Sequence, residues 1–127
     1  MTKLQREQVR AKFGGRCAYC GHPLGQRWHV DHLDPVCRRS WLGDGCMERP
    51  GNDTLANMMP ACVPCNLDKH ARSLEDWRGK LGRSAAVLAR NSTTYRHATR
   101  FGLVVDTGAA VVFHFERMRK AVLPEDD

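Results

Sequence analysis

Four cysteines are arranged in two Cys-x-x-Cys pairs, Cys17/Cys20 and Cys62/Cys65, and this spacing is typical of a metal site. Two intervening residues let the backbone fold back, so that both sulfurs of a pair can bind one tetrahedral zinc ion at about 2.3 Å. Four thiolates leave no open coordination position, which predicts a structural rather than a catalytic zinc. The ion would join the two Cys-x-x-Cys turns, here called knuckles, and its loss should unfold the domain. Free or disulfide-bonded cysteines are the alternative, which a reducing compartment disfavours.

Cys37 and Cys46 are not spaced as a knuckle. Eight residues, positions 38 to 45, separate them in a segment punctuated by glycine and proline. They could bind a second metal with His29 or His22, form a labile disulfide, or be unrelated buried thiols. We favour the last of these interpretations.

Three segments carry a further pattern around the paired cysteines. They are Cys17-Ala18-Tyr19-Cys20-Gly21, then Val30-Asp31-His32-Leu33-Asp34-Pro35, then the stretch from Asn57 to Lys69. In these segments the sequence resembles the HNH endonucleases, the ββα-metal or His-Me finger nucleases of phages, restriction systems and homing elements. The resemblance spans residues 4 to 78, and Asn57 and Asn66 lie nine apart, as the family usually has them. It implies an α+β fold with a small, treble-clef-like ββα-metal core, one structural zinc and endonuclease activity on DNA.

Phosphodiester hydrolysis requires a base that deprotonates water and a cation that stabilises the charge on the leaving 3′ oxygen. His32 is the candidate general base, because imidazole titrates near neutral pH. Asp31, its neighbour on a predicted strand, points to the opposite side and offers an oxygen ligand for Mg²⁺ or a similar ion. The resemblance implies that Asn66 supplies a second oxygen ligand. It also implies that Asn57 orients the His32 ring or its loop without touching the metal.

The sequence departs from the family pattern at Asn66, where many members carry the last histidine. An amide oxygen there favours a hard cation such as Mg²⁺ or Mn²⁺ over a metal that prefers two imidazoles. His70, four residues after Asn66 on the same helix face, could be a third ligand or a phosphate contact. His29, two residues before Asp31, shares its side of the strand and could also line the site. The remaining histidines are expected to be structural or surface residues: His22, His97 and His114.

The formal net charge of +6 fits a polyanionic partner such as DNA, although a modest surplus can also serve solubility alone. Several basic side chains follow the motif helix, and we expect some of them to line a DNA groove. They are Lys69, Arg72, Arg78, Lys80 and Arg83. Further arginines could extend the DNA contact toward the C-terminus: Arg90, Arg96 and Arg100.

No apolar run approaches the roughly 20 residues that span a bilayer, which argues against a transmembrane helix. The residues after Met1 have no apolar stretch behind their basic side chains, which predicts no signal peptide. The expected compartment is therefore the cytoplasm, where cysteines stay reduced.

The catalytic residues require a scaffold, which the sequence pattern outlines. A short amphipathic helix is predicted over residues 4–13, ended by two glycines, and a strand over residues 28–32. Residues 34–53 are predicted to be a loop, about ten residues longer than is usual in the family. A short strand or turn at residues 55–59 and a helix at residues 62–71 complete the predicted core.

The C-terminal part is predicted to be helical at first. Ser73 suits the cap of a helix that runs to about residue 81, and residues 84–89 continue helical. A β-hairpin is expected from residues 103–105 and 111–115, before a frayed tail at 123–127. We therefore expect an HNH nuclease core at residues 1–80 and an accessory helix and hairpin at residues 81–127, in one compact unit.

The main alternative is a non-catalytic, zinc-stabilised module that binds DNA or protein. It explains the cysteines and the charge but gives Asp31, His32 and the two asparagines no joint purpose. A zinc nucleobase deaminase is disfavoured because the nearest match to its His-x-Glu signature, His29-Val30-Asp31, lacks the glutamate. Small stand-alone HNH proteins resemble phage packaging nucleases that work with a terminase, restriction components or homing enzymes. The expected state is a monomer or a homodimer.

Overall fold

The computed structural model describes residues 1–36 and 50–122. Cys37, Cys46, most of the predicted 34–53 loop and the predicted tail at residues 123–127 lie outside the described residues. The chain divides into two compact units, Met1–Leu74 with Val112–Asp127, and Glu75–Val111. The expected division was residues 1–80 and 81–127 within one compact unit; here the first unit is interrupted after Leu74 and resumes at Val112.

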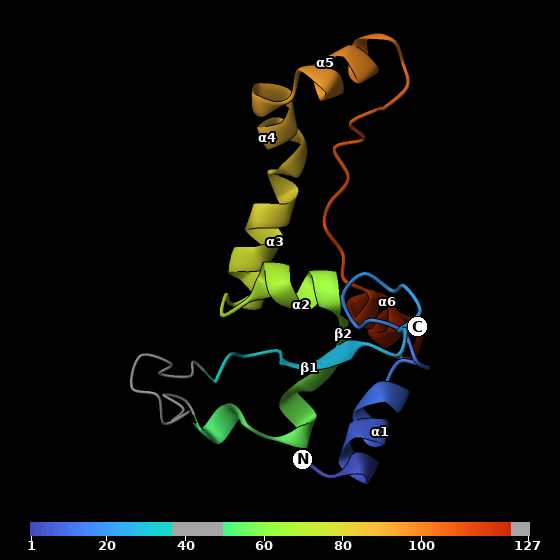
Figure 1. Cartoon of the computed structure of the whole chain (residues 1–127), viewed down its shortest axis with the longest axis vertical. Helices are drawn as coiled ribbons and strands as arrows, with labels where there is room; N and C mark the ends of the chain where they lie inside the picture. The colour runs from blue at the N-terminus through green and yellow to red at the C-terminus, as the bar shows by residue number, and fades with distance from the viewer. Residues whose placement is uncertain (37–49, 123–127) are drawn as a thin grey trace, which may run out of the picture. The chain divides into compact units, whose positions relative to one another are not determined.

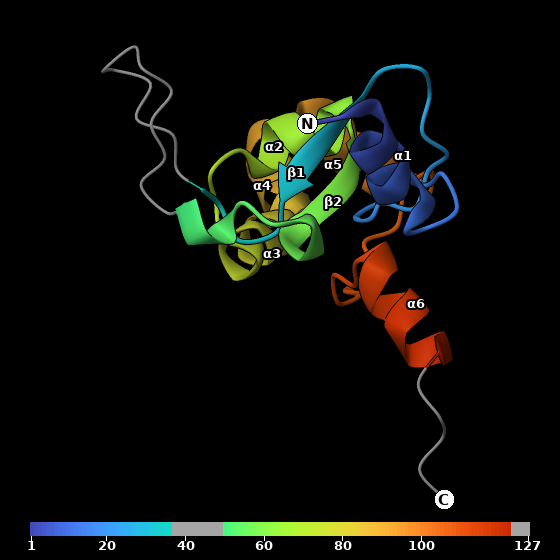
Figure 2. The same ribbon diagram turned by 90° about the horizontal axis from the view of Figure 1, so that it is seen from below.

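The first unit is built on two antiparallel strands that run side by side and on the helix that follows them (Figures 1 and 2). β1 (Trp28–His32) pairs with β2 (Met58–Cys62) in a register that places Asp31 opposite Met59. α2 (Val63–Lys69) begins directly after β2, and Pro64 lies in its first turn. Proline is tolerated there because N–H groups of the first turn have no hydrogen-bond partner within the helix. This strand–strand–helix order confirms the predicted α+β core.

α1 (Lys3–Ala11) begins one residue before the predicted start. Thr2 and Gln5 form a reciprocal capping box that satisfies two N–H groups at the helix start. Just after the helix, the Lys12 ammonium donates to the carbonyls of Leu55 and Met58. Lys12 thereby joins the end of α1 to the short 3-10 turn η3 (Leu55–Asn57) and to β2, while a second turn, η2 (Pro50–Asn52), lies before it.

Three helices follow in sequence: α3 (Leu74–Gly82), α4 (Ser84–Asn91) and α5 (Thr93–Arg100). The helix expected after Ser73 and the helical continuation from residue 84 are confirmed. Ser92 separates α4 from α5, because its side chain accepts a hydrogen bond from the Tyr95 N–H at the start of α5. No helix in the described part of the chain is long and apolar enough to cross a membrane.

The β-hairpin predicted for residues 103–105 and 111–115 is wrong. Residues 103–112 form no strand, Leu103 is 81% exposed, and α6 (His114–Val122) begins where the second strand was expected. The alternation of apolar and polar residues there has a different cause. Phe113 and Phe115 are both buried at the start of a helix, and Glu116 accepts a hydrogen bond from the Phe113 N–H. Periodicity alone does not distinguish a short strand from such a helix start.

The start of α6 packs against the first cysteine knuckle. The backbone N–H groups of His114 and Phe115 donate to the carbonyls of Tyr19 and Ala18 at 2.9 and 2.8 Å. The rings of Phe113 and Phe115 stand edge-on to the Tyr19 ring, at centroid distances of 5.7 and 6.2 Å. The C-terminal segment therefore completes the core of the first unit around Tyr19.

Candidate functional site

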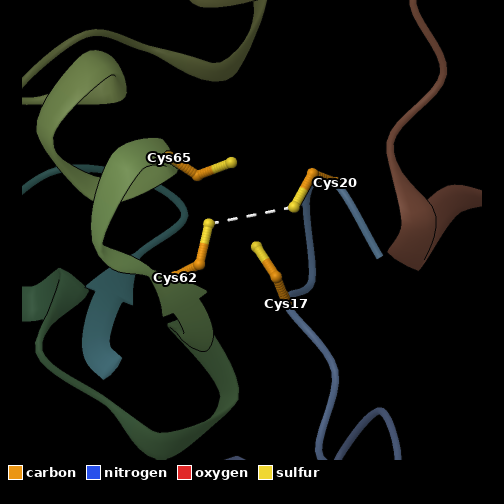
Figure 3. Close-up of side chains that lie close together, drawn as sticks. All are labelled: Cys17, Cys20, Cys62 and Cys65. Carbon is orange, nitrogen blue, oxygen red and sulfur yellow. Dashed lines mark hydrogen bonds between the residues drawn. The ribbon is translucent and has the colours of Figure 1, made fainter. Parts of the chain in front are cut away.

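The four paired cysteines converge on one point (Figure 3). Cys17 and Cys20 come from the loop after α1, Cys62 ends β2, and Cys65 lies in the first turn of α2. Their sulfur atoms all lie within 4.8 Å of one another, and those of Cys20 and Cys62 are 3.8 Å apart. A tetrahedral ion with Zn–S bonds of about 2.3 Å has sulfur–sulfur edges of about 3.8 Å. The cluster could therefore hold one metal ion, and its geometry suits zinc.

Full ionisation of this cluster requires a cation. A hydrogen bond from the Cys65 thiol lowers the pKa of Cys17 to about 4, and the same contact, with burial, raises the pKa of Cys65. Burial, with the negative charge at Cys17, raises the pKa of Cys20 to about 11. Without a cation, Cys17 therefore forms a thiolate readily, whereas Cys20 and Cys65 resist adding further negative charge. A divalent metal removes this repulsion, which fits a closed four-sulfur site.

Asp31 is held by two buried side chains. The Tyr19 hydroxyl and the Lys69 ammonium both contact Asp31 Oδ2, the ammonium at 3.1 Å. Lys69 is fully buried and also donates to the His32 carbonyl at 2.9 Å. Burial and the charge of Asp31 raise the pKa of Tyr19 above its usual range, so the hydroxyl keeps its proton and donates it. The carboxylate is thus fixed in one orientation, with both contacts on the same oxygen.

Asp31 lines a cleft of about 180 Å³ together with His32, Asn66 and His70. β1 supplies the first two side chains, and the C-terminal half and end of α2 supply the other two. The structure thus brings to one cleft the aspartate, the histidine and the asparagine that the sequence assigned to one site. His29, in contrast, lines a separate pocket with Arg6 and Trp28.

His70 has an unusual backbone conformation at the end of α2. Its φ of 51° is the one positive φ of a non-glycine residue among residues 1–36 and 50–122. Such conformations are unfavourable for a residue with a Cβ and persist where the surrounding structure enforces them, often at functional sites. The conformation turns the chain at the edge of the cleft.

His32 has a carboxylate partner that sequence reasoning missed. His32 Nε2 and Asp53 Oδ1 are 2.9 Å apart, and the imidazole is 15% exposed. Asp53 lies between the turns η2 and η3, 21 residues from His32 in the sequence. Asp53 belongs to no motif in the sequence, so its spacing from His32 gave no signal. The contact depends on how the segment before β2 folds back toward β1.

Asn57 holds the backbone around the cleft. Its Nδ2 donates to the carbonyls of Asp34 and Asn52 at 2.8 and 2.7 Å, and its Oδ1 accepts from the Asp34 N–H at 2.9 Å. Of the two expected roles, orientation of the His32 ring or of its loop, these contacts correspond to the loop. The segment after β1 is thereby tied to the segment before β2.

The expected phosphate contact of Lys69 does not fit the structure, because its ammonium is buried between Asp31 and the His32 carbonyl. Arg72 is exposed and donates to the Asp68 carbonyl. The other residues expected to contact DNA belong to the second unit. There Arg78 pairs with Glu75 and donates to the Val111 carbonyl. Lys80 is half-buried and Arg83 is exposed.

Comparison with known proteins points to one family. Residues 17–72 match the family model described as HNH endonuclease. A relative of Bacillus subtilis (strain 168), the SPbeta prophage-derived protein YoqL, is named as a candidate HNH endonuclease and is 26% identical over 77 residues. That alignment covers 61% of this chain and 33% of the relative, so the chain spans about one third of the length of the curated relative it matches. No solved structure matches the chain.

Proposed function

We propose that this chain is a metal-dependent endonuclease that hydrolyses phosphodiester bonds of DNA, because residues 17–72 match the HNH endonuclease family model. One observation carries the proposal: Asp31, His32 and Asn66, from β1 and α2, line the same cleft. An imidazole beside two hard oxygen donors is the set of groups that metal-assisted hydrolysis requires. The net charge of +6 supports a polyanionic substrate.

Asp31 and Asn66 would hold the catalytic cation in this proposal. A carboxylate and an amide oxygen are hard ligands that suit Mg²⁺ or Mn²⁺, ions that keep several waters and bind substrate phosphate. His70 lines the same cleft and is the best-placed additional ligand or phosphate contact. The bound cation would stabilise the charge that develops on the leaving 3′ oxygen. The four-cysteine cluster would hold a second, structural ion, which we propose to be zinc.

His32 would act as the general base. When Nε2 carries the proton and donates to Asp53, Nδ1 is the ring nitrogen that can accept a proton from water. Asp53 would then fix both the tautomer and the orientation of the imidazole. Asn57 would act through the backbone, by holding the segment that follows His32.

The decisive test is incubation of supercoiled plasmid with the zinc-loaded protein and Mg²⁺ or Mn²⁺. We expect nicking that requires the divalent ion, and we expect His32→Ala to lower its rate by about 10² to 10⁴-fold, the usual contribution of a general base. Far-ultraviolet circular dichroism and zinc content should stay unchanged in the variant. No nicking by the native protein, or equal nicking by His32→Ala, would favour the non-catalytic zinc module instead.

Removal of the Asp53 carboxylate should affect turnover rather than DNA binding. We expect Asp53→Ala to lower kcat about 10-fold with little change in KM, because partners of this kind usually contribute 10 to 100-fold. Asp53→Asn retains an acceptor for Nε2 and should lose less. The control is Asp34→Ala, which removes the same charge from an exposed position. Equal kcat values for Asp53→Ala and the native protein would remove Asp53 from the mechanism.

The prophage origin of the YoqL relative supports a phage-type role for this chain. Packaging with a terminase, homing and restriction are the roles we propose to test first. A monomer with one cleft would cut both strands only by two visits, whereas a homodimer could cut both at once. Time-resolved conversion of supercoiled to nicked and then linear plasmid distinguishes these two modes.

A further inference from the structure

Arg6 of α1 is held in a fixed position against β1. Its guanidinium carbon lies 3.9 Å from the centroid of the Trp28 ring, and its Nη2 donates to the Trp28 carbonyl at 2.8 Å. Trp28 is buried, so it provides a rigid platform for the cation. The hydrogen bond to the carbonyl uses one of the five N–H donors of the arginine. A guanidinium ordered in this way loses little conformational entropy when it binds a phosphate.

Arg6 borders a pocket of about 450 Å³ whose lining, among residues 1–36 and 50–122, includes no acidic side chain. Arg27 and His29 add two exposed basic side chains from the start of β1 and the residue before it. Trp28, Gln26 and Val63 complete the lining. The composition of this pocket, two guanidinium groups and an imidazole, suits the phosphate groups of a nucleic acid backbone.

This basic pocket is linked to the catalytic cleft through a pocket that lies between them. A second pocket of about 660 Å³ shares Arg6 with the basic pocket, and it shares His32 with the cleft. Asp53, the acidic residue that lines it in the described part of the chain, is paired with His32. The three pockets therefore follow one another along β1, with His32 between the first two and Arg6 between the last two.

The distance along β1 from the catalytic cleft to the basic pocket matches several nucleotides. β1 covers four residue steps from His32 back to Trp28, which is about 13 Å at roughly 3.3 Å per residue. A DNA strand in a duplex advances about 3.4 Å per nucleotide along the helix axis, so this distance corresponds to about four nucleotides. The basic pocket is therefore far enough from His32 to bind a phosphate other than the one that is cut.

We propose that the cleaved DNA strand leaves the catalytic cleft along β1, and that Arg6 and Arg27 bind its phosphates in the basic pocket. This inference rests on the proposed nuclease function and adds a substrate path that the endonuclease motif does not contain. The path lies on the α1 side of β1, whereas the basic residues singled out in the sequence follow α2. A role in phosphate binding explains why the Arg6 guanidinium is already stacked on Trp28 and hydrogen-bonded to its carbonyl before DNA binds.

The test measures DNA binding separately from cleavage. The His32→Ala protein, zinc-loaded, is titrated against a fluorescent 20-base-pair duplex at several salt concentrations, and the slope of log K against log salt is determined. In this background, Arg6→Gln/Arg27→Gln should weaken binding at least 10-fold and reduce the slope by about two, roughly 0.9 for each phosphate that the protein no longer neutralises. Arg27→Gln alone leaves the Arg6–Trp28 stacking in place and should reduce the slope by about one.

Two further variants control for net charge and for the alternative surface. Arg117→Gln/Arg119→Gln removes the same charge from exposed positions on α6 and should leave the slope nearly unchanged. Arg72→Gln/Arg83→Gln tests the basic residues that follow α2. An unchanged slope in Arg6→Gln/Arg27→Gln, with native zinc content and circular dichroism, would overturn the proposed path while nicking by the native protein still supported the nuclease. If the His32→Ala protein bound no DNA even at low salt, the DNA substrate itself would be overturned.

Discussion

Replacement of Cys62 by alanine is expected to remove both the bound metal and the fold of the first unit. Cys62 ends β2, provides the N-cap position of α2 and contributes one of four converging sulfurs. Metal binding to structural zinc sites of this kind contributes on the order of 10 kcal/mol, which is comparable with the whole stability of a small domain. Zinc content by mass spectrometry and circular dichroism should therefore fall together, and nicking should be lost with them.

A cysteine outside the cluster provides the matched control. Cys46→Ala should retain one zinc per chain and native circular dichroism, because the four clustered sulfurs already complete the coordination. Chelation of the native protein should reproduce the effect of Cys62→Ala. A folded Cys62→Ala protein that carries a full equivalent of zinc would contradict the assignment of this cluster as the structural site.

Replacement of Lys69 by methionine should destabilise the protein more than a surface lysine change and should also impair turnover. Lys69 is fully buried, and its ammonium contacts the carboxylate of Asp31, itself only 7% exposed. Removal of one partner of a buried ion pair leaves an uncompensated charge and typically lowers the free energy of unfolding by about 3 to 5 kcal/mol. Urea denaturation at constant zinc and without Mg²⁺ measures this loss, and Lys3→Met, at an exposed position, should change stability little.

A second substitution separates the charge effect from simple loss of packing. In Asp31→Asn/Lys69→Met both charges are absent, so we expect the double variant to recover much of the stability lost in Lys69→Met. Neither variant should nick plasmid at the native rate, since Lys69→Met removes one of the two contacts that orient the Asp31 carboxylate and the double variant lacks the carboxylate. If the double variant were as unstable as the sum of both single variants, the ion pair would not be the cause.

The sequence was sufficient for the features whose evidence lies in short spacings. Two Cys-x-x-Cys pairs predicted a common metal cluster, and the alternation around Asp31 predicted the strand on which it lies. The resemblance to the HNH endonucleases assigned Asn66 to the site of Asp31 and His32, and α2, which follows β2 without a linker, brings it to the same cleft. The relative positions of residues that are close in the sequence can be predicted, because they depend on strand and helix geometry alone.

Contacts between distant residues could not be predicted in the same way. Lys69 and Asp31 are 38 positions apart (69 minus 31), and a lysine after a motif helix has the same sequence signature whether it binds phosphate or a buried carboxylate. Asp53 contacts His32 from 21 positions away in the sequence, in a region where Asn57 ties the segment after β1 to the segment before β2. The predicted C-terminal hairpin failed for a related reason: the partner of Phe113 and Phe115 is Tyr19, almost a hundred residues earlier.

The return of the C-terminal segment to Tyr19 has a consequence for how the chain is made. Residues 1–74 leave the ribosome first, but the aromatic cover of Tyr19 follows only after the whole of Glu75–Val111 has been synthesised. The packing around Tyr19, which contacts Asp31, is therefore complete only once residues 113–115 have been made. A transcript truncated after residue 80 would encode every residue of the endonuclease motif and still yield an incompletely packed core. The segment of chain that completes this core is therefore longer than the motif.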